Sequence, residues 1–183
     1  MQRNSRPTDW IASPAPSATR LQRQWLTRQG ALTHGLRQLG VLSLRVLSEK
    51  VCRASYDEAV KLGLSLGQAL WQREVCMSIL GIDCVVARSI APLAATQGHW
   101  QALKRLRNRP LADILYHDRA IVRSEFAFTA LRLGMPLYRL SQASSAAGLS
   151  VLARRSVFTR AGQPLLVAEA FLPAFWVIAK NTP

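Results

Sequence analysis

Two charged residues, Glu169 and Arg73, stand inside apolar stretches of this sequence. If the stretch around Glu169 is a strand, alternate side chains point to opposite faces, and the carboxylate shares its face with Leu165, Val167 and Phe171. The same alternation puts Arg73 on a face of large apolar side chains. A charge in such a place is costly unless it is paired or used. The sequence therefore predicts one inward anion and one inward cation on two different strands.

These residue types suit the binding of a hydroxy acid. An inward arginine can hold a carboxylate in its plane, and an inward glutamate can bind a hydroxyl or move a proton. The alternative is a buried ion pair between Arg73 and Glu169, a weak source of stability because desolvation offsets the attraction. Arg88 and Arg155 are candidates for additional anion contacts. Because Arg154 is adjacent to Arg155, only one of the two can face inward, and we expect the other on the surface.

Motifs of several common enzyme classes are absent from the sequence. It has no Walker loop, GxGxxG or zinc-binding pattern, so nucleotide and dinucleotide functions have no support. His34, His99 and His117 lie far apart without metal-ligand spacing, and we expect no metal site. The three cysteines show no CxxC spacing; their odd number and apolar neighbours predict reduced core thiols in a cytoplasmic protein.

The composition predicts one globular domain. With 183 residues, 49% of them hydrophobic, the chain can build one core and is too short to expect two. We expect residues 1–18, rich in Pro and Ser, to form a mobile leader, and residues 19–183 to form the domain. The leader does not resemble a signal peptide. Two apolar stretches, residues 75–95 and 164–179, are too short or too polar for membrane spans and are interpreted as core strands.

The net charge of +14 comes mainly from arginine. Arginine suits bidentate recognition of carboxylates and phosphates, but a solvated surface explains the composition equally well. Nucleic-acid binding is a further alternative that such a charge invites. The basic residues are nevertheless spread along the whole chain, and no nucleic-acid-binding motif is present. We therefore expect no nucleic-acid partner.

Periodicity predicts both helices and strands. Helices are expected in residues 19–39, with a break near Gly30 and an end at Gly40, and in residues 100–115, where Pro110 starts a second helix. Residues 55–63 fit a turn or a short helix.

Strands are expected at residues 41–54, 70–80, 83–90, 121–133, 148–159 and 165–172. Gly81 joins the second and third as a hairpin, and the turn Arg160–Gln163 joins the last two. Glu74 faces away from Arg73 and is expected to be solvated. Hairpins with helices between them indicate an α+β fold with a single antiparallel sheet and surrounding helices.

Six short segments carry a resemblance to a known family. They are Trp25-Leu-Thr-Arg-Gln-Gly-Ala-Leu32-Thr33, Trp71-Gln-Arg73-Glu74, Ala87-Arg88-Ser-Ile-Ala-Pro92, Arg109-Pro110-Leu111-Ala-Asp-Ile-Leu115-Tyr, Arg154-Arg155-Ser156 and Gly162-Gln-Pro-Leu-Leu-Val-Ala-Glu169-Ala-Phe-Leu-Pro173. No single segment is sufficient. Their order and spacing together resemble the chorismate pyruvate-lyase (chorismate lyase) family.

The resemblance implies an enzyme that removes pyruvate from chorismate, without a cofactor, to give 4-hydroxybenzoate for ubiquinone. The implied fold buries its ligand beneath flap-like segments. The family's ligand-contacting arginine and glutamate fall on Arg73 and Glu169, the two positions that strand parity selects. Its other contacts fall on Leu111 and on Leu32, where a family member has methionine, a residue of similar volume. We expect a monomer whose partners are its substrate and its product.

From these residues we form a hypothesis for the mechanism. Arg73 would hold the ring carboxylate together with backbone N–H groups near Leu32 and Leu111, and Glu169 would bind the ring hydroxyl. The hydrogen on the hydroxyl-bearing carbon would pass to the enolpyruvyl methylene either directly or through a protein base. The positive field would speed the encounter with a dianion.

The enolpyruvyl carboxylate is expected to meet Arg88 or Arg155. A different function stays open as the alternative to a lyase, namely a non-catalytic domain that binds a small aromatic acid. Effector domains of bacterial transcription regulators use the same fold type, and fold alone does not determine function.

Overall fold

A computed structural model of the chain describes residues 9–143 and 150–182. Its strands are β1 (Leu42–Arg53), β2 (Ala69–Ile79), β3 (Ile82–Pro92), β4 (Ile121–Arg123), β5 (Ala127–Ala130), β6 (Leu152–Arg160) and β7 (Gln163–Phe171). Its helices are α1 (Arg20–Leu26), α2 (Leu32–Leu39), α3 (Tyr56–Leu62), α4 (Ala112–Leu115), α5 (Pro136–Gln142) and α6 (Pro173–Asn181), with 3₁₀ turns η1 (Ala94–Gln97) and η2 (Gln101–Arg105).

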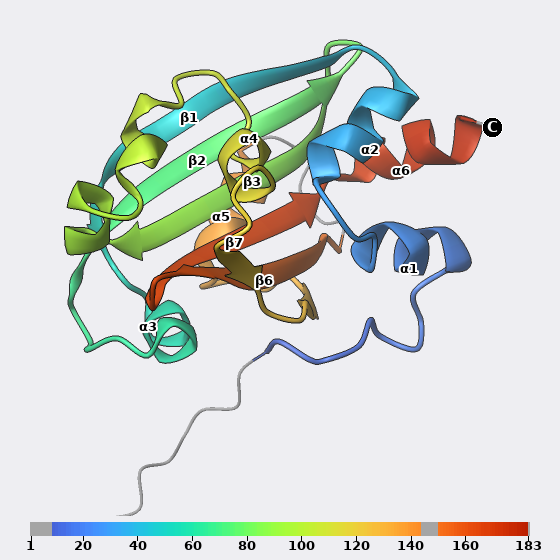
Figure 1. Cartoon of the computed structure of the whole chain (residues 1–183). Helices are drawn as coiled ribbons and strands as arrows, with labels where there is room; N and C mark the ends of the chain where they lie inside the picture. The colour runs from blue at the N-terminus through green and yellow to red at the C-terminus, as the bar shows by residue number, and fades with distance from the viewer. Residues whose placement is uncertain (1–8, 144–149, 183) are drawn as a thin grey trace, which may run out of the picture.

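The strands form one seven-stranded antiparallel sheet in the order β1-β2-β3-β7-β6-β4, and β5 pairs with β6 beside β4 (Figure 1). The predicted α+β class with a single antiparallel sheet is confirmed. Both predicted hairpins are present, with turns at Leu80–Gly81 and Ala161–Gly162. Gly81 and Gly162 have φ of 81° and 76°, a left-handed conformation that tight hairpin turns require and glycine adopts without strain.

The helices near the N-terminus follow their local sequence signals. Thr19 caps α1 through a capping box with Gln22, and Ser55 caps α3 in the same way with Glu58. The predicted break near Gly30 and the end of the second helix at Gly40 are confirmed. Residues 55–63, left open between a turn and a short helix, contain helix α3.

Three predicted elements were wrong in type or extent. The strand expected at residues 121–133 is divided into β4 and β5, which pair with different parts of β6. Within residues 100–115, five residues form the 3₁₀ turn η2, and only the four residues of α4 are α-helical. The apolar stretch 164–179, interpreted as a strand, continues beyond β7 as helix α6, because Pro173 presets the φ of a first helical residue.

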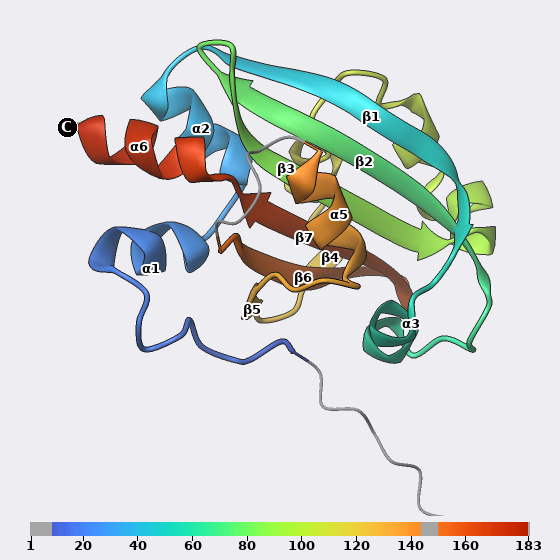
Figure 2. The same cartoon turned by 180° about the vertical axis from the view of Figure 1, so that it is seen from behind.

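The sheet is covered on both faces. On the face toward the viewer in Figure 1, called the front face, α1, α2 and α6 cover one end, while η1, η2 and α4 cover the other. On the back face, α3 and α5 pack against the sheet (Figure 2). The front face therefore carries two separate apolar clusters, and the space between them is where a ligand site can form.

The first eight residues of the expected leader lie outside the described residues. Further along the leader, Ile11 pairs with Phe128 of β5 through two backbone hydrogen bonds of 2.9 and 2.8 Å. No helix in the described part of the chain is long and apolar enough to span a membrane.

Candidate active site

A cavity lies on the front face between the two apolar clusters. Strands β2, β3, β6 and β7 form its floor, and the first residues of α2 together with residues 110–116 form its walls. Apart from a few polar groups the lining is apolar, as in most small-molecule sites.

All four of the predicted ligand contacts line this one cavity: Leu32, Arg73, Leu111 and Glu169. They belong to four segments that are far apart in sequence, namely the start of α2, strand β2, the N-cap of α4 and strand β7. The structure thus brings together the residues that strand parity and the family resemblance selected.

The Arg73 side chain is buried in the cavity floor and is 3% exposed. Its Nη2 donates to the backbone oxygens of Arg107 and Arg109, at 2.7 and 3.1 Å. Its Nε makes no hydrogen bond within the described residues and lies 3.9 Å from Glu49 Oε2. Burial lowers the pKa of Arg73, and the Glu49 charge opposes that shift. Arg73 therefore fixes the segment that leads to Leu111 and retains donor capacity for an anion.

Arg73 does not pair with Glu169, so the alternative of an ion pair between them was wrong. Strand β3 lies between their strands: Arg73 is opposite Ser89, and Glu169 is opposite Ala87. Two strand spacings separate their backbones by roughly 10 Å across the sheet. The two charges stand on one face with the cavity between them.

Glu169 pairs instead with Arg154, its direct neighbour on β6. Arg154 Nε donates to Glu169 Oε2 at 2.6 Å. The guanidinium lies over the ring of Phe126, 4.4 Å from the ring centroid, a favourable cation–π geometry. The Glu169 side chain is 16% exposed, so the pair is largely shielded from water.

Arg154 also fixes the end of α1. Its Nη1 donates to the backbone oxygens of Trp25 and Leu26, both at 3.3 Å, and of Arg28 at 2.8 Å. These carbonyls lie at the negative end of the helix dipole, which favours a cation. Because residues 27–31 lead directly to Leu32, Arg154 connects Glu169 to the chain that forms one cavity wall.

The sequence interpretation missed Arg154. We expected only one of Arg154 and Arg155 to be inward, yet both are buried, at 1% and 4% exposure, on opposite faces of a doubly covered sheet. A signal was available in the sequence, because counting pairs back from the turn at Gly162 places Arg154 directly opposite Glu169.

Leu32 and Leu111 both lie where a helix begins. Leu32 is the first residue of α2, whose N-cap residue Ala31 offers no side-chain acceptor, and Leu111 is the N-cap of α4. The first N–H groups of a helix have no partner within it, so such positions can donate to a carboxylate. Both lie on the cavity wall.

The two walls are joined by a hydrogen bond. The Tyr116 hydroxyl, at the end of α4, donates to the backbone oxygen of Gly30 at 2.9 Å. Burial raises the pKa of Tyr116, which keeps the hydroxyl a donor. The segments before α2 and after α4 are therefore held together beside the cavity that Leu32 and Tyr116 line.

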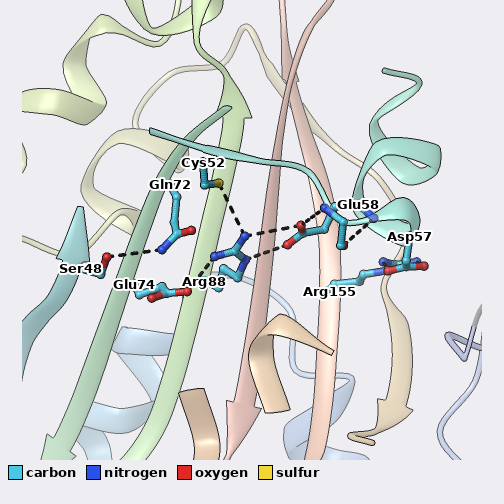
Figure 3. A network of polar contacts seen from close by, with 9 residues as sticks. Ser48, Cys52, Asp57, Glu58, Gln72, Glu74, Arg88 and Arg155 are labelled. Carbon is cyan, nitrogen blue, oxygen red and sulfur yellow. Dashed lines mark hydrogen bonds and ion pairs between the residues drawn. The ribbon is translucent and has the colours of Figure 1, made fainter. Parts of the chain in front are cut away.

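Arg88 and Arg155, the expected additional anion contacts, point to the back face and line other cavities (Figure 3). Arg88 Nε donates to Glu58 Oε1 and its Nη1 to Glu74 Oε1, both at 2.7 Å. Arg155 forms a two-bond ion pair with Asp57. Glu74 does face away from Arg73, but the prediction that it is solvated was wrong, because it pairs with Arg88.

These back-face groups hold α3 against the sheet. Burial alone would lower the pKa of Arg88, but the carboxylates of Glu58 and Glu74 outweigh burial and leave that pKa above its ordinary value. The pKa of Arg155 is lowered by burial, against the opposing effect of Asp57. Glu58 also completes the capping box of α3, so one carboxylate serves both the helix and the network.

The three cysteines are free thiols, as predicted. Cys76 and Cys84 are buried, and Cys52 is half-buried, with its Sγ 3.8 Å from Arg88 Nη2. Burial raises the pKa of all three, that of Cys76 to about 12. They are core groups and do not line the cavity of Arg73.

Comparison of sequences places the chain among lyases. The chorismate lyase family profile matches residues 4–180. A probable chorismate pyruvate-lyase of Bordetella avium is 52% identical over 167 residues, covering 91% of this chain and 84% of that protein. One from Bordetella pertussis is 50% identical over 174 residues, covering 93% and 92%, and one from Pseudomonas fluorescens is 40% identical over 167 residues, covering 91% and 90%.

Comparison of structures finds the same fold in regulators. The C-terminal domain of PhnF matches with a TM-score of 0.60 at 17% identity, covering 79% of this chain and 89% of that one. The C-terminal domain of the histidine utilization repressor from Pseudomonas syringae matches with a TM-score of 0.54 at 16% identity, covering 73% and 92%. At these identities the likeness shows the fold alone.

Proposed function

The chain belongs to the chorismate lyase family, and we propose that it converts chorismate to 4-hydroxybenzoate and pyruvate, supplying the ring precursor of ubiquinone. One observation carries the proposal. Buried Arg73 and half-buried Glu169 line one largely apolar cavity, and neither neutralises the other. A flat hydroxy acid with its carboxylate at one end and its hydroxyl at the other matches that separation.

The ring carboxylate of chorismate binds at Arg73 in this proposal. The guanidinium has a buried Nε without a hydrogen bond in the described structure, and the starts of α2 and α4 add backbone donors at Leu32 and Leu111. Charge-assisted hydrogen bonds of this kind are the strongest available to a carboxylate. The ring hydroxyl, at the opposite end of the ring, then reaches Glu169.

The reaction completes an aromatic ring. The hydrogen leaves the hydroxyl-bearing carbon, the ether bond on the neighbouring carbon breaks, and the freed electron pair forms the third ring double bond. The hydrogen ends on the methylene carbon of the enolpyruvyl group, which becomes pyruvate. Nothing is oxidised or reduced by a second reactant, so the proposal includes no cofactor.

The residues of the cavity contribute orientation and electrostatics. Glu169 accepts the hydroxyl proton in a hydrogen bond that strengthens as the phenol forms, and Arg154 holds the carboxylate in place. Apolar residues of the floor and walls limit access of water, which makes each polar contact stronger. These effects act on a reaction that aromatisation already favours.

Incubation with chorismate tests the proposal directly. Purified protein should release pyruvate and 4-hydroxybenzoate in equal amounts, followed with lactate dehydrogenase and by ultraviolet absorbance. Heat-denatured protein measures the spontaneous decay of chorismate. Binding of 4-hydroxybenzoate without turnover of chorismate would instead support the alternative of a non-catalytic aromatic-acid-binding domain.

A further inference from the structure

We propose that Arg154 binds the second carboxylate of the substrate, the one on the enolpyruvyl group. The inference rests on the proposed function and adds a residue role to it. It replaces Arg88 and Arg155, which point to the back face, with a cation that lines the cavity itself.

Arg154 has a donor group to spare. Its Nε donates to Glu169, and its Nη1 donates to backbone oxygens at the end of α1. Its Nη2 donates no hydrogen bond within the described residues and is not among the fully buried atoms without a partner, so it keeps some accessible surface on a side chain that lines the cavity. A guanidinium N–H group that is accessible at the cavity surface can donate a charge-assisted hydrogen bond to an anionic ligand there.

The position of Arg154 matches the shape of the substrate. The hydroxyl and the enolpyruvyl ether of chorismate stand on neighbouring ring carbons, so a group bonded to Glu169 lies beside the enolpyruvyl arm. Arg73 is committed to the opposite end of the ring, and its backbone lies roughly 10 Å from that of Glu169 across the sheet. Among the described residues lining the cavity, Arg73 and Arg154 are the two cations, which suits a substrate with two carboxylates.

Sharing one arginine also solves a charge problem. The enolpyruvyl carboxylate would lie close to Glu169, and two carboxylates repel each other unless a cation separates them. Arg154 presents its Nε–H to Glu169 and has an Nη2–H for the substrate, so different N–H groups of one cation serve the two anions. Once the ether bond breaks, pyruvate carries this carboxylate away, and the remaining product no longer engages Nη2.

Two unreactive aromatic acids can be used to measure the contact between Arg154 and the carboxylate on the ether arm. 3-(Carboxymethoxy)-4-hydroxybenzoate and 3-methoxy-4-hydroxybenzoate share the ring carboxylate and hydroxyl, and they differ by the carboxylate on the ether arm. Titration calorimetry should find that the wild-type protein binds the diacid at least about tenfold more tightly than the monoacid. In Arg154→Gln the ratio of the two dissociation constants should fall to near one.

Arg155→Gln is the matched control. It removes the adjacent arginine, which is equally buried but faces the back of the sheet, and the ratio should stay as in the wild type. If Arg154→Gln does not fold, the double variant Arg154→Gln/Glu169→Gln removes both partners of the pair and is compared with Glu169→Gln alone. The ratio of the two dissociation constants in the wild-type protein also tests the inference, and its measurement needs no variant.

Equal affinity of the wild type for the two acids overturns the inference. So does a ratio that Arg154→Gln leaves unchanged while both affinities fall together, because that pattern shows an arginine that only positions Glu169. Absence of pyruvate release by the wild type is a different failure: it removes the proposed lyase function, while the comparison of the two acids still reports on Arg154.

Discussion

Glu169 accepts a 2.6 Å hydrogen bond from Arg154, the residue directly opposite it on the neighbouring strand. The group proposed to bind the substrate hydroxyl is thus held from the side by a rigid cross-strand partner. Its position depends on the register of one hairpin, which places the carboxylate in the cavity before any ligand arrives.

Glu169→Gln should lower the turnover number for chorismate about a hundredfold or more, because the amide cannot supply the negative charge that attracts the hydroxyl proton. The amide oxygen still accepts from Arg154, so we expect a stability loss of only about 1–2 kcal/mol. Pyruvate release and chemical denaturation measure the two effects. Glu125→Gln, at an exposed position, is the control. Unfolding of Glu169→Gln with unchanged specific activity would favour a purely structural glutamate.

Arg73→Ala should raise the dissociation constant of 4-hydroxybenzoate about 10- to 100-fold, since it removes the charged partner of the ring carboxylate. Arg73→Lys keeps the charge and should recover part of the affinity. Calorimetric titration measures both variants, with Arg45→Ala as a surface control whose side chain is 61% exposed. Affinity unchanged in Arg73→Ala would show that the carboxylate binds elsewhere.

Leu32→Pro tests the backbone donor at the start of α2. Proline is tolerated at a first helical position, and Ala31 has the extended conformation that a residue before proline prefers. The substitution therefore removes the N–H group and keeps the helix. Leu32→Ala shortens the side chain but retains the N–H group. We expect weaker 4-hydroxybenzoate binding in Leu32→Pro than in Leu32→Ala; equal binding in the two would exclude this donor. Leu32→Met should be nearly neutral.

Arg88→Met should destabilise the fold by about 3–5 kcal/mol, because it leaves the buried carboxylate of Glu58 and the half-buried carboxylate of Glu74 without their cation. Adding Glu58→Gln and Glu74→Gln to the same chain should recover much of that loss. Denaturation midpoints in urea report the free energy of unfolding. If the triple variant is no more stable than Arg88→Met, the network contributes through packing rather than charge.

The buried thiol of Cys76 predicts a pH dependence of stability. Its pKa is raised from 9.0 to about 12 by burial, so the unfolded chain releases this proton at lower pH than the folded chain. The contribution of the protonated Cys76 thiol to the free energy of unfolding is fully present below pH 9.0. It is lost progressively as the pH rises toward about 12. The difference in melting temperature between wild type and Cys76→Ala should shrink over that range. A difference in melting temperature that stays constant over this pH range would contradict the raised pKa of Cys76.

Much of the fold follows from local signals. The hairpin turns at Gly81 and Gly162, the break at Gly30 and the alternation of β2 and β7 were sufficient to predict one antiparallel sheet with Arg73 and Glu169 on apolar faces. Alternation alone does not say which elements cover each face. For that reason it could not reveal that the back face is also buried.

The wrong predictions for the arginines Arg88, Arg154 and Arg155 have the same cause, because the sequence did not reveal that both faces of the sheet are covered. A single-faced sheet would leave one of Arg154 and Arg155 in solvent, whereas a sheet covered on both sides buries both. Likewise, Arg88 was assigned to the ligand because its partners Glu58 and Glu74 come from other elements, and no local pattern brings them together. Long-range pairing of charges depends on packing, which the sequence does not display directly.

The adjacency of Arg154 and Arg155 restricts how this protein can change. A one-residue slip of β6 against β7 would exchange the two arginines between the faces, moving the ligand-side cation into the α3 contact and the α3-side cation into the cavity. Insertions or deletions inside β6 should therefore be tolerated in pairs of residues, if at all. Mutational scanning by single-codon deletion along this strand would show inactivation at every position that shifts the parity of the arginine pair.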